Sequence, residues 1–418
     1  MKRSWRSVAI VIVAFLVVVI GLDRSATAAA AAQSDSVIVV LRDGVDADHT
    51  AAQHGASYGA QVSHVYRSAL RGYAAHIPAS ARRAIAGDPR VAFISEDREV
   101  WASDTVPTGV DRIDADLSSK FAQNNGGPAV AVIDTGSGPH SELNIAGGVN
   151  CSTGRSFNDG NGHGTHVAGT IAAKLNGAGV VGVLPGAPIY SVRVLNNRGS
   201  GSFSAVICGI DWVTANAAAT GIKVANMSLG GAGADDGNCG RTNGDALHQA
   251  ICNSVGNGIT YVVAAGNSGA DLQSFVPAAY DEVLAVTAMS DSDGKPGALG
   301  GAPTCRTGES DDAPATFSNF ATTAADRAHT IAAPGVCILS TWKGGGYNTI
   351  SGTSMASPHA AGTVALCIAG PCAGMTPSAI IAKLRADAAA RPATYGFAGD
   401  ANSGNTRYYG HLIYAGGY

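Results

Sequence analysis

The sequence predicts an α/β fold with a mainly parallel central sheet, preceded by a small α+β domain. Short apolar runs alternate with longer helical stretches along residues 107–389, which is typical of strands connected through helices. Residues 34–100 instead follow the order β-α-β-β-α-β, which predicts a ferredoxin-like domain. Charged residues make up only 14% of the chain. That share is below the roughly 25% of an average globular protein and favours a compact structure with tight turns.

Residues 1–28 have the pattern of a secretory signal peptide, with a charged start, an apolar core at 8–22 and a small-residue cleavage site at 26–28. A membrane anchor is the alternative. The apolar run is shorter than the ~20 residues that a membrane span needs, however, and Asp23-Arg24 interrupts it. We therefore expect a secreted, extracellular protein without a stable membrane anchor.

The elements of the small domain, residues 34–100, can be assigned in order. Strands are expected at 37–41, 62–66, 70–77 and 91–94, and helices at 46–59 and 78–85.

The larger domain, residues 103–418, is long enough to bury a large core without a covalent crosslink. Strands are expected at 129–134, 189–195, 224–229, 259–265 and 283–288. Helices are expected at 202–216, 245–256, 359–369 and 377–389. The polar, glycine-rich residues 290–312 are expected to form an exposed loop.

Two candidate catalytic side chains follow from these elements. Asp134 ends an unbroken apolar run, as in a buried parallel strand, and open α/β sheets place their sites at that edge. An Asp before Gly is also common in plain turns. In residues 161–170, glycines lead into a helix of small residues, and we place His166 at its start. His163 and His166 could instead form a metal pair, but no third ligand supports one.

A candidate nucleophile lies in the heptapeptide Gly-Thr-Ser-Met-Ala-Ser-Pro, residues 352–358. Ser354 follows a glycine and opens a run that predicts a buried helix, where N–H groups and the macrodipole favour developing negative charge. Pro358 is expected within the first turn, where its missing N–H costs nothing. The alternative is a simple helix cap.

Together, the three segments resemble the subtilisin-type serine peptidases, in the proteinase K-like subgroup, from about Pro107 to the C-terminus. The resemblance implies a subtilisin-like three-layer fold. It also implies Ser354 as nucleophile, His166 as general base and then acid, and Asp134 as the carboxylate that orients the imidazole. A serine hydroxyl is a poor nucleophile without such a base. An imidazole suits the task because its ordinary pKa is near ~6.5.

The resemblance also implies an oxyanion hole at Asn267, which follows an apolar strand. Its amide can donate to the tetrahedral intermediate together with the N–H of Ser354, although Asn-Ser-Gly is also ordinary turn chemistry.

A substrate cleft is implied in which the peptide pairs as an added strand. One wall is Ser228, Leu229 and Gly230, and the other is Ala264, Ala265 and Gly266. The alternative is a pair of plain strands ending at glycines. No Asp or Glu occurs in these segments, so we predict broad specificity with apolar or aromatic P1 side chains.

A structural Ca²⁺ site is a further implication, because residues 174–180 have the length of the family's calcium loop. The implied ligands are the Asn176 side chain, the carbonyls of Lys174, Ala178 and Val180, and Glu142. Oxygen ligands of this kind suit Ca²⁺. The segment before Glu142 is one residue shorter than in the family, and a plain glycine-rich turn is the alternative.

The small domain resembles the inhibitory propeptide that precedes many subtilisin-like peptidases. Its tail is expected to occupy the cleft as an intramolecular inhibitor until the chain is cut between about residues 100 and 104. An independent binding module is the alternative.

Eight cysteines, all after residue 150, and a secretory signal predict disulfides in an oxidising compartment. Connectivity stays open, because eight cysteines allow 105 pairings. Our trial pairs are Cys367–Cys372, Cys239–Cys252, Cys305–Cys337 and Cys151–Cys208. A cis peptide before Pro277, which the family often has near this point, also stays open.

The net charge of −4 and the absence of basic runs argue against nucleic acid and anionic membranes as partners. The preferred function is a monomeric, secreted serine endopeptidase that acts on proteins and peptides and is made as an autoprocessed zymogen. The alternative is a catalytically idle secreted relative with a binding or structural role.

Overall fold

The computed structural model describes residues 36–97, 104–124, 127–400 and 406–418. The chain divides into two compact units, Met1–Val100 and Trp101–Tyr418. The signal peptide expected at 1–28, and all but the last residue of the processing region expected at 100–104, lie outside the described residues.

The first unit has the expected order of elements and forms a four-stranded antiparallel sheet, β2-β3-β1-β4. Alternate residues of β1 point inward and pack against the two helices, as a sheet with one covered face requires. Its elements are β1 (Ser36–Leu41), α1 (Ala47–Tyr58), β2 (Gln61–Tyr66), β3 (Gly72–His76), α2 (Ala79–Ala86) and β4 (Val91–Glu96).

The second unit is built on an eight-stranded sheet in the order β13-β12-β10-β8-β5-β7-β6, with β14 also paired to β12. Every pairing is parallel except that of β13 with β12. The strands are β5 (Ala129–Asp134), β6 (Ile145–Asn150), β7 (Ile189–Arg193), β8 (Ile222–Met227), β10 (Thr260–Ala264), β12 (Leu284–Ser290), β13 (Ala313–Pro314) and β14 (Thr330–Pro334).

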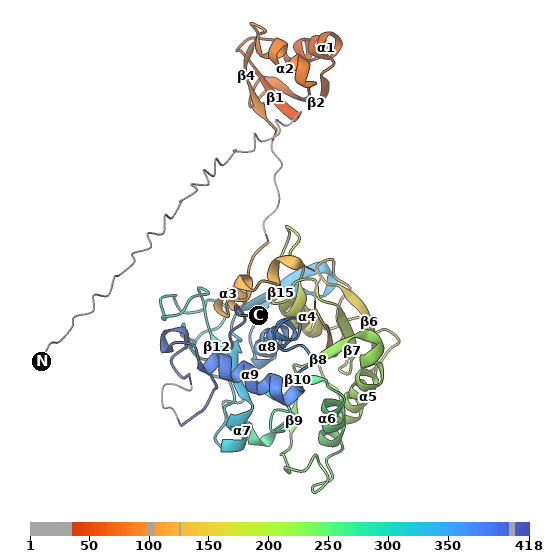
Figure 1. The fold of residues 1–418 in the computed structure, drawn as a ribbon, viewed down its shortest axis with the longest axis vertical. Coiled ribbons are helices and arrows are strands. Elements are labelled where there is room, and N and C mark those ends of the chain that lie inside the picture. The colour runs from red at the N-terminus through yellow and green to blue at the C-terminus, as the bar shows by residue number, and fades with distance from the viewer. Residues whose placement is uncertain (1–35, 98–103, 125–126, 401–405) are drawn as a thin grey trace, which may run out of the picture. The chain divides into compact units, whose positions relative to one another are not determined.

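Helices cover both faces of this sheet, which gives three layers (Figure 1). On one face lie α4 (His163–Ala172), α8 (Thr353–Ile368) and α9 (Pro377–Ala389). On the other lie α5 (Phe203–Thr220) and α6 (Ala246–Gly256). Central strand β5 is buried on both sides: Val130 and Val132 pack toward the first group, and Ala131 and Ile133 toward the second. The predicted α/β class and mainly parallel sheet are confirmed.

Shorter elements complete the unit. They include α3 (Thr108–Arg112), α7 (Ala324–Ala328) and two antiparallel strand pairs, β9 (Gly231–Ala232) with β11 (Phe275–Val276) and β15 (Ile338–Trp342) with β16 (Gly346–Ile350). One expected boundary is wrong: helix α8 begins at Thr353, so Pro358 lies in its second turn and not in its first.

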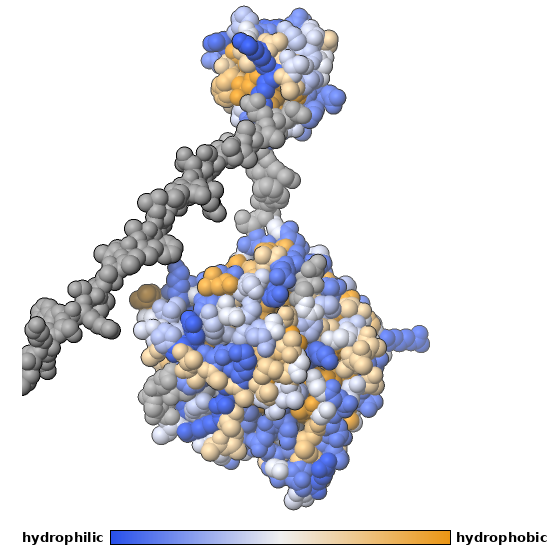
Figure 2. All heavy atoms as spheres, in the orientation of Figure 1, coloured by the Kyte–Doolittle hydropathy of each residue, from blue (hydrophilic) through white to orange (hydrophobic). Residues whose placement is uncertain are grey.

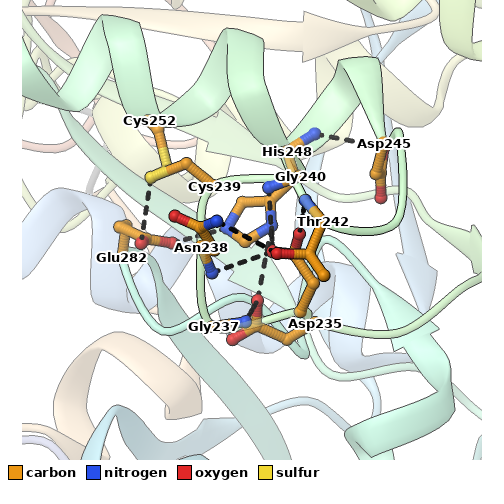
Figure 3. The surroundings of a disulfide bond; sticks show 11 residues. Asp235, Gly237, Asn238, Cys239, Gly240, Thr242, Asp245, His248, Cys252 and Glu282 are labelled. Atoms are coloured by element: carbon orange, nitrogen blue, oxygen red, sulfur yellow. Dashed lines mark hydrogen bonds and ion pairs between the residues drawn. A yellow bond between two sulfur atoms is a disulfide. The ribbon is translucent and has the colours of Figure 1, made fainter.

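The four trial disulfides are confirmed, and none of the eight cysteines is free. Figure 3 shows Cys239–Cys252, which joins the loop before α6 to that helix. A cis peptide is present at Val276–Pro277, and a second at Gly138–Pro139.

The visible face of the larger unit mixes hydrophilic and hydrophobic residues (Figure 2). Within the described residues, no helix has the length and apolar character needed to cross a bilayer.

Candidate functional site

Asp134 lies at the carboxyl end of β5, at the sheet edge where α/β proteins place their sites. Its side chain is buried and accepts hydrogen bonds from His163 Nδ1, with distances of 2.8 and 3.0 Å to the two carboxylate oxygens. The Thr135 N–H holds the same carboxylate at 2.7 Å. The structure therefore pairs Asp134 with His163.

His166, which we expected to be the general base, does not contact Asp134. It is fully buried, and its Nε2 donates to the Ile338 carbonyl at 2.9 Å. Burial lowers the pKa of His166 to about 3, so the ring stays neutral and shielded from a substrate. The expected position of His166 at the sheet edge is wrong, because α4 begins three residues earlier than expected, which leaves His163 at the edge and His166 in the interior.

The loop before α4 explains that start. Asp159, which the sequence analysis missed, accepts hydrogen bonds from the N–H groups of Asn161, Gly162 and Thr165. These bonds fix the backbone at the start of the helix. Helix α4 then approaches β5 closely at Gly164, where a Cβ atom would lie 2.0 Å from the Gly136 carbonyl oxygen. The signal that could have found this start is the run Asp-Gly-Asn-Gly directly before the first histidine.

Two opposed effects set the protonation of His163, whose side chain is about a quarter exposed. Burial favours the neutral ring, but the charge of Asp134, its hydrogen bond and the charge of Asp159 outweigh burial. The net result raises the pKa of His163 above its ordinary value. With Nδ1 engaged by Asp134, Nε2 is the nitrogen left to accept a proton.

Ser354 lies in the first turn of α8 and is tied to a wall of the expected cleft. Its hydroxyl donates to the Ser228 carbonyl at 3.2 Å, and the Ser228 hydroxyl donates to the Ser354 carbonyl at 2.8 Å. Pro358 makes the second bond available, because it has no N–H to donate to the carbonyl four residues before it. The Pro358 position that we predicted wrongly thus couples Ser354 to Ser228.

Asn267 lies beside the start of α8. Its Oδ1 accepts from the N–H and the hydroxyl of Thr353 at 2.8 and 2.9 Å. This anchoring of the amide oxygen leaves Nδ2 without a hydrogen-bond partner among the described residues. The Thr353 hydroxyl also accepts the N–H of Gly266 at 3.1 Å, which places the second expected wall next to Ser354.

A cavity of about 560 Å³ lies beside His163 and Ser228. His163, Ser228, Leu229 and Gly230 line it, together with Leu195, Phe203 and Val206. Residues 264–266 do not line it, although Ala264 ends β10, the parallel neighbour of β8, and Ala265 and Gly266 follow directly.

Comparison with known proteins identifies this arrangement. The model of the subtilase family matches residues 125–411, about two thirds of the chain. The chain belongs to the subtilase family. A second model, peptidase inhibitor I9, matches residues 17–102 of this subtilase.

Among similar proteins, alkaline elastase YaB of Bacillus sp. (strain YaB) is 39% identical over 280 residues, which is 67% of this subtilase and 64% of that protein. Subtilisin DY of Bacillus licheniformis is 39% identical over 267 residues, 63% of this chain and 84% of that one. The crystal structure of a cold adapted subtilisin-like serine proteinase is similar with a TM-score of 0.54 and 31% identity, over 75% of this chain and 99% of that chain. The proteinase K-like subgroup stays a prediction.

The structure brings only some of the Ca²⁺ ligands implied for this subtilase close to one another. The Lys174 N–H donates to the Glu142 carbonyl at 3.0 Å, so the acidic residue and the loop are neighbours. Glu142 is buried, and its Oε2 has no hydrogen-bond partner among the residues that the structure describes. Asn176 Oδ1 accepts from Ala178 N at 3.2 Å. Asp104, which the sequence analysis missed, accepts the N–H groups of Gly177 and Ala178 at 2.8 Å.

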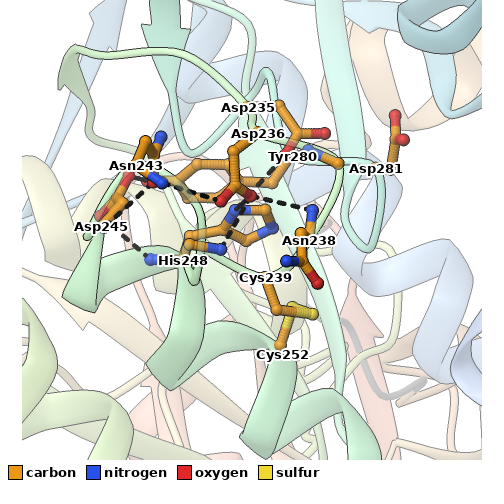
Figure 4. Close-up of polar contacts among 12 residues, drawn as sticks. Asp235, Asp236, Asn238, Cys239, Asn243, Asp245, His248, Cys252, Tyr280 and Asp281 are labelled. Atoms are coloured by element: carbon orange, nitrogen blue, oxygen red, sulfur yellow. Dashed lines mark hydrogen bonds and ion pairs between the residues drawn. A yellow bond between two sulfur atoms is a disulfide. The ribbon is translucent and has the colours of Figure 1, made fainter.

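A second histidine–carboxylate cluster lies beside the Cys239–Cys252 disulfide (Figure 4). Within it, buried His248 stacks on the ring of Tyr280 and donates through Nε2 to Glu282 at 2.8 Å. None of these residues lines the cavity at His163.

Proposed function

We propose that this subtilase is a secreted serine endopeptidase that cuts peptide bonds through Asp134, His163 and Ser354. The observation that carries the proposal is the Asp134–His163 hydrogen bond at the wall of a cavity that also contains Ser228, to which Ser354 is bonded. His163 replaces His166 as the base.

The chemistry follows from these contacts. His163 Nε2 takes the proton as Ser354 Oγ attacks the peptide carbonyl, while Asp134 holds the ring and stabilises the imidazolium. Asn267 Nδ2 and the Ser354 N–H donate to the developing oxyanion. Protonation of the leaving amine by His163 gives an acyl-enzyme, which water then hydrolyses with His163 again as the base.

Broad specificity for apolar or aromatic P1 side chains remains part of the proposal. Ser228, Leu229 and Gly230 form one wall, and Ala264, Ala265 and Gly266 follow the adjacent strand. No carboxylate lies among these residues to pair with Lys or Arg. A peptide-library profile dominated by Arg or Lys at P1 would contradict this assignment.

The inhibitor-type match at 17–102 supports synthesis as a zymogen, with residues 34–100 inhibiting the peptidase until cleavage between about 100 and 104. The signal-peptide pattern at 1–28 supports secretion, and we propose a monomer as the mature form. Mass spectrometry of the secreted protein gives the first residue of the mature chain. A mature chain that still began before residue 90 would contradict this processing.

The function is tested by incubating the protein with casein, with and without a serine-directed fluorophosphonate. Ser354→Ala should lose turnover by a factor on the order of 10⁶, as in subtilisin. If a folded Ser354→Ala variant cuts casein at a comparable rate, the catalytic assignment is wrong. If the wild-type chain neither cuts nor reacts, the catalytically idle alternative holds.

We also propose that Glu142, Asn176 and the carbonyls of Lys174, Ala178 and Val180 hold a structural Ca²⁺, with Asp104 as a further neighbour. The supporting observation is Glu142 Oε2, a buried carboxylate oxygen beside the loop that finds no hydrogen-bond partner in the described part of the chain. EDTA should lower the melting temperature of the protein, and Glu142→Gln should remove most of that response. An unchanged melting temperature with EDTA would refute the site.

A further inference from the structure

Arg198 is the one permanently charged side chain among the described residues that line the cavity at His163. The other lining side chains are apolar or neutral and polar, apart from the imidazole of His163 itself. No carboxylate lines the cavity, so nothing there repels an acidic group of a bound peptide. Among the described lining residues, Arg198 is therefore the permanent positive charge that a negative charge entering this cavity would meet.

The guanidinium of Arg198 is exposed and has no hydrogen bond or ion pair among the described residues. Its neighbour Arg193 shows the opposite arrangement. Arg193 is buried and donates to Asn197 Oδ1 at 2.7 Å and to the carbonyls of Ser156 and Asn158. Arg193 is therefore a structural cation, whereas the charge of Arg198 is available to a ligand.

The backbone that carries Arg198 is held firmly. Asn196 Oδ1 accepts the Arg198 N–H at 2.8 Å, and the Asn196 N–H donates to the Ser200 carbonyl at 2.9 Å. Asn161 connects this turn to the catalytic segment, because its Nδ2 donates to the Asn197 carbonyl at 3.0 Å and its Oδ1 accepts the His163 N–H at 3.2 Å. The backbone from which the Arg198 side chain extends thus has a defined place relative to His163.

We propose that Arg198 is a specificity-determining residue that favours substrates with an acidic side chain on the N-terminal side of the scissile bond. This inference rests on the proposed peptidase function. The N-terminal side is favoured because Ser228, Leu229 and Gly230, which line the same cavity, form the wall assigned to P1 and the residues before it. A charged guanidinium that faces an acidic side chain forms a charge-assisted hydrogen bond.

The expected effect is modest because Arg198 is exposed. A rim ion pair in water favours Glu over Gln by roughly two- to fivefold, and added salt screens it. The contact forms in the ground state and the transition state alike, so the preference should appear mainly in KM.

The test uses active protein obtained from the full chain and fluorogenic peptides with Phe at P1. One residue is varied among Glu, Gln and Lys at P2, P3, P4 and, as a control position, P2′. The wild type should rank Glu above Gln above Lys at one of the positions before P1. Arg198→Glu should invert the order at that position. Lys223→Glu serves as the control, because Lys223 is an exposed cation that lines a different pocket and its replacement makes the same change of charge. This variant should leave the order unchanged.

Two results overturn the inference while the proposed function stands. One is an order that Arg198→Glu leaves unchanged in an enzyme that still cleaves the peptides, and the other is a preference confined to P2′. A wild-type chain that cleaves no peptide and does not react with the fluorophosphonate would refute the peptidase function itself.

Discussion

His163 in the cleft and His248 beside the Cys239–Cys252 disulfide each have one ring nitrogen 2.8 Å from a carboxylate oxygen. They differ in what faces the other nitrogen. The ring of His163 lines a cavity, so its second nitrogen can meet a substrate. The ring of His248 is fully buried, and its Nδ1 lies 3.3 and 3.4 Å from carboxylate oxygens of Asp235 and Asp236.

The surroundings of His248 indicate an imidazolium that holds a loop together. Asp236 accepts the N–H groups of Asn238, Gly240, Thr242 and Asn243, which fills both of its oxygens. Tyr280 stacks on the ring with centroids 4.0 Å apart and donates to Asp245, the residue that caps α6. A His–carboxylate pair alone therefore does not identify a catalytic base; access to the second nitrogen does.

The largest expected effect comes from replacing each of the two histidines, which tests whether their roles differ. His163→Ala should lower kcat per folded molecule by a factor on the order of 10⁶, the loss that subtilisin shows without its base. His248→Ala should leave kcat per folded molecule within about twofold but lower stability, because three carboxylates lose their cation. Peptide kinetics and thermal denaturation measure the two effects.

His166→Ala serves as the internal control for this pair. It removes a buried side chain that donates to Ile338, so it should destabilise the fold while folded molecules keep their base. A folded His163→Ala variant with full activity, together with an inactive but folded His166→Ala variant, would return the assignment to His166.

The next largest effect comes from replacing the carboxylate that pairs with each histidine. Asp134→Asn should lower kcat by about 10⁴-fold, since the amide no longer stabilises the imidazolium or holds the productive tautomer. Glu282→Gln changes the equivalent group in the second cluster and should cost about 1–2 kcal/mol of stability without a comparable loss of kcat. Equal losses of kcat in both variants would mean that the two clusters do not differ in role.

Much of the fold could be predicted because apolar patterning specifies buried strands directly. Strand β5 has the predicted bounds, Ala129–Asp134, since a continuous apolar run ending in Asp has few other interpretations in an α/β chain. Strand β6, Ile145–Asn150, was missed because its two glycines and partly buried positions give neither an apolar run nor a clear alternation. Strand β14 was also missed, because its second half, Ala332-Ala333-Pro334, consists of residues that are unfavourable in strands.

The site was predicted less well where it depends on contacts between distant residues. Both histidines of the His-Gly-Thr-His segment fit a small-residue helix, and the choice between them depends on where the helix starts. Asp159 sets that start through bonds to N–H groups, which apolar patterning does not register. In the same way, the hydroxyl of Ser228 compensates for Pro358 from a strand far away in the sequence.

A smaller effect concerns the crosslink that belongs to the second cluster. Replacing Cys239 and Cys252 together by Ala opens a loop with a sequence separation of 13 and should lower the free energy of unfolding by roughly 3 kcal/mol. Urea denaturation in a Ser354→Ala background measures it without autolysis. Replacing the pair Cys367 and Cys372, with a separation of 5, should cost less. A large loss of kcat in the Cys239–Cys252 variant would show that the cluster supports catalysis.

The smallest expected effect is the pH dependence of stability. Burial alone would lower the pKa of His248, but its hydrogen bond to Glu282 and the charges of Glu282, Asp235 and Asp236 outweigh burial and raise it. A group whose pKa is raised by folding stabilises the fold fully below its unfolded pKa, about 6.5 for His, and loses this contribution as the pH rises through the folded value.

As the pH rises above about 6.5, the parent Ser354→Ala protein should therefore lose more stability than the same protein carrying His248→Gln. Urea denaturation at a series of pH values gives the free energy of unfolding of each protein. His163 also has a raised pKa and makes both proteins less stable as the pH rises, so its contribution cancels when the two are subtracted. Equal slopes in the two proteins would mean that folding does not raise the pKa of His248. Asp235 and Asp236 would then be held by the loop's N–H groups without help from a charged ring.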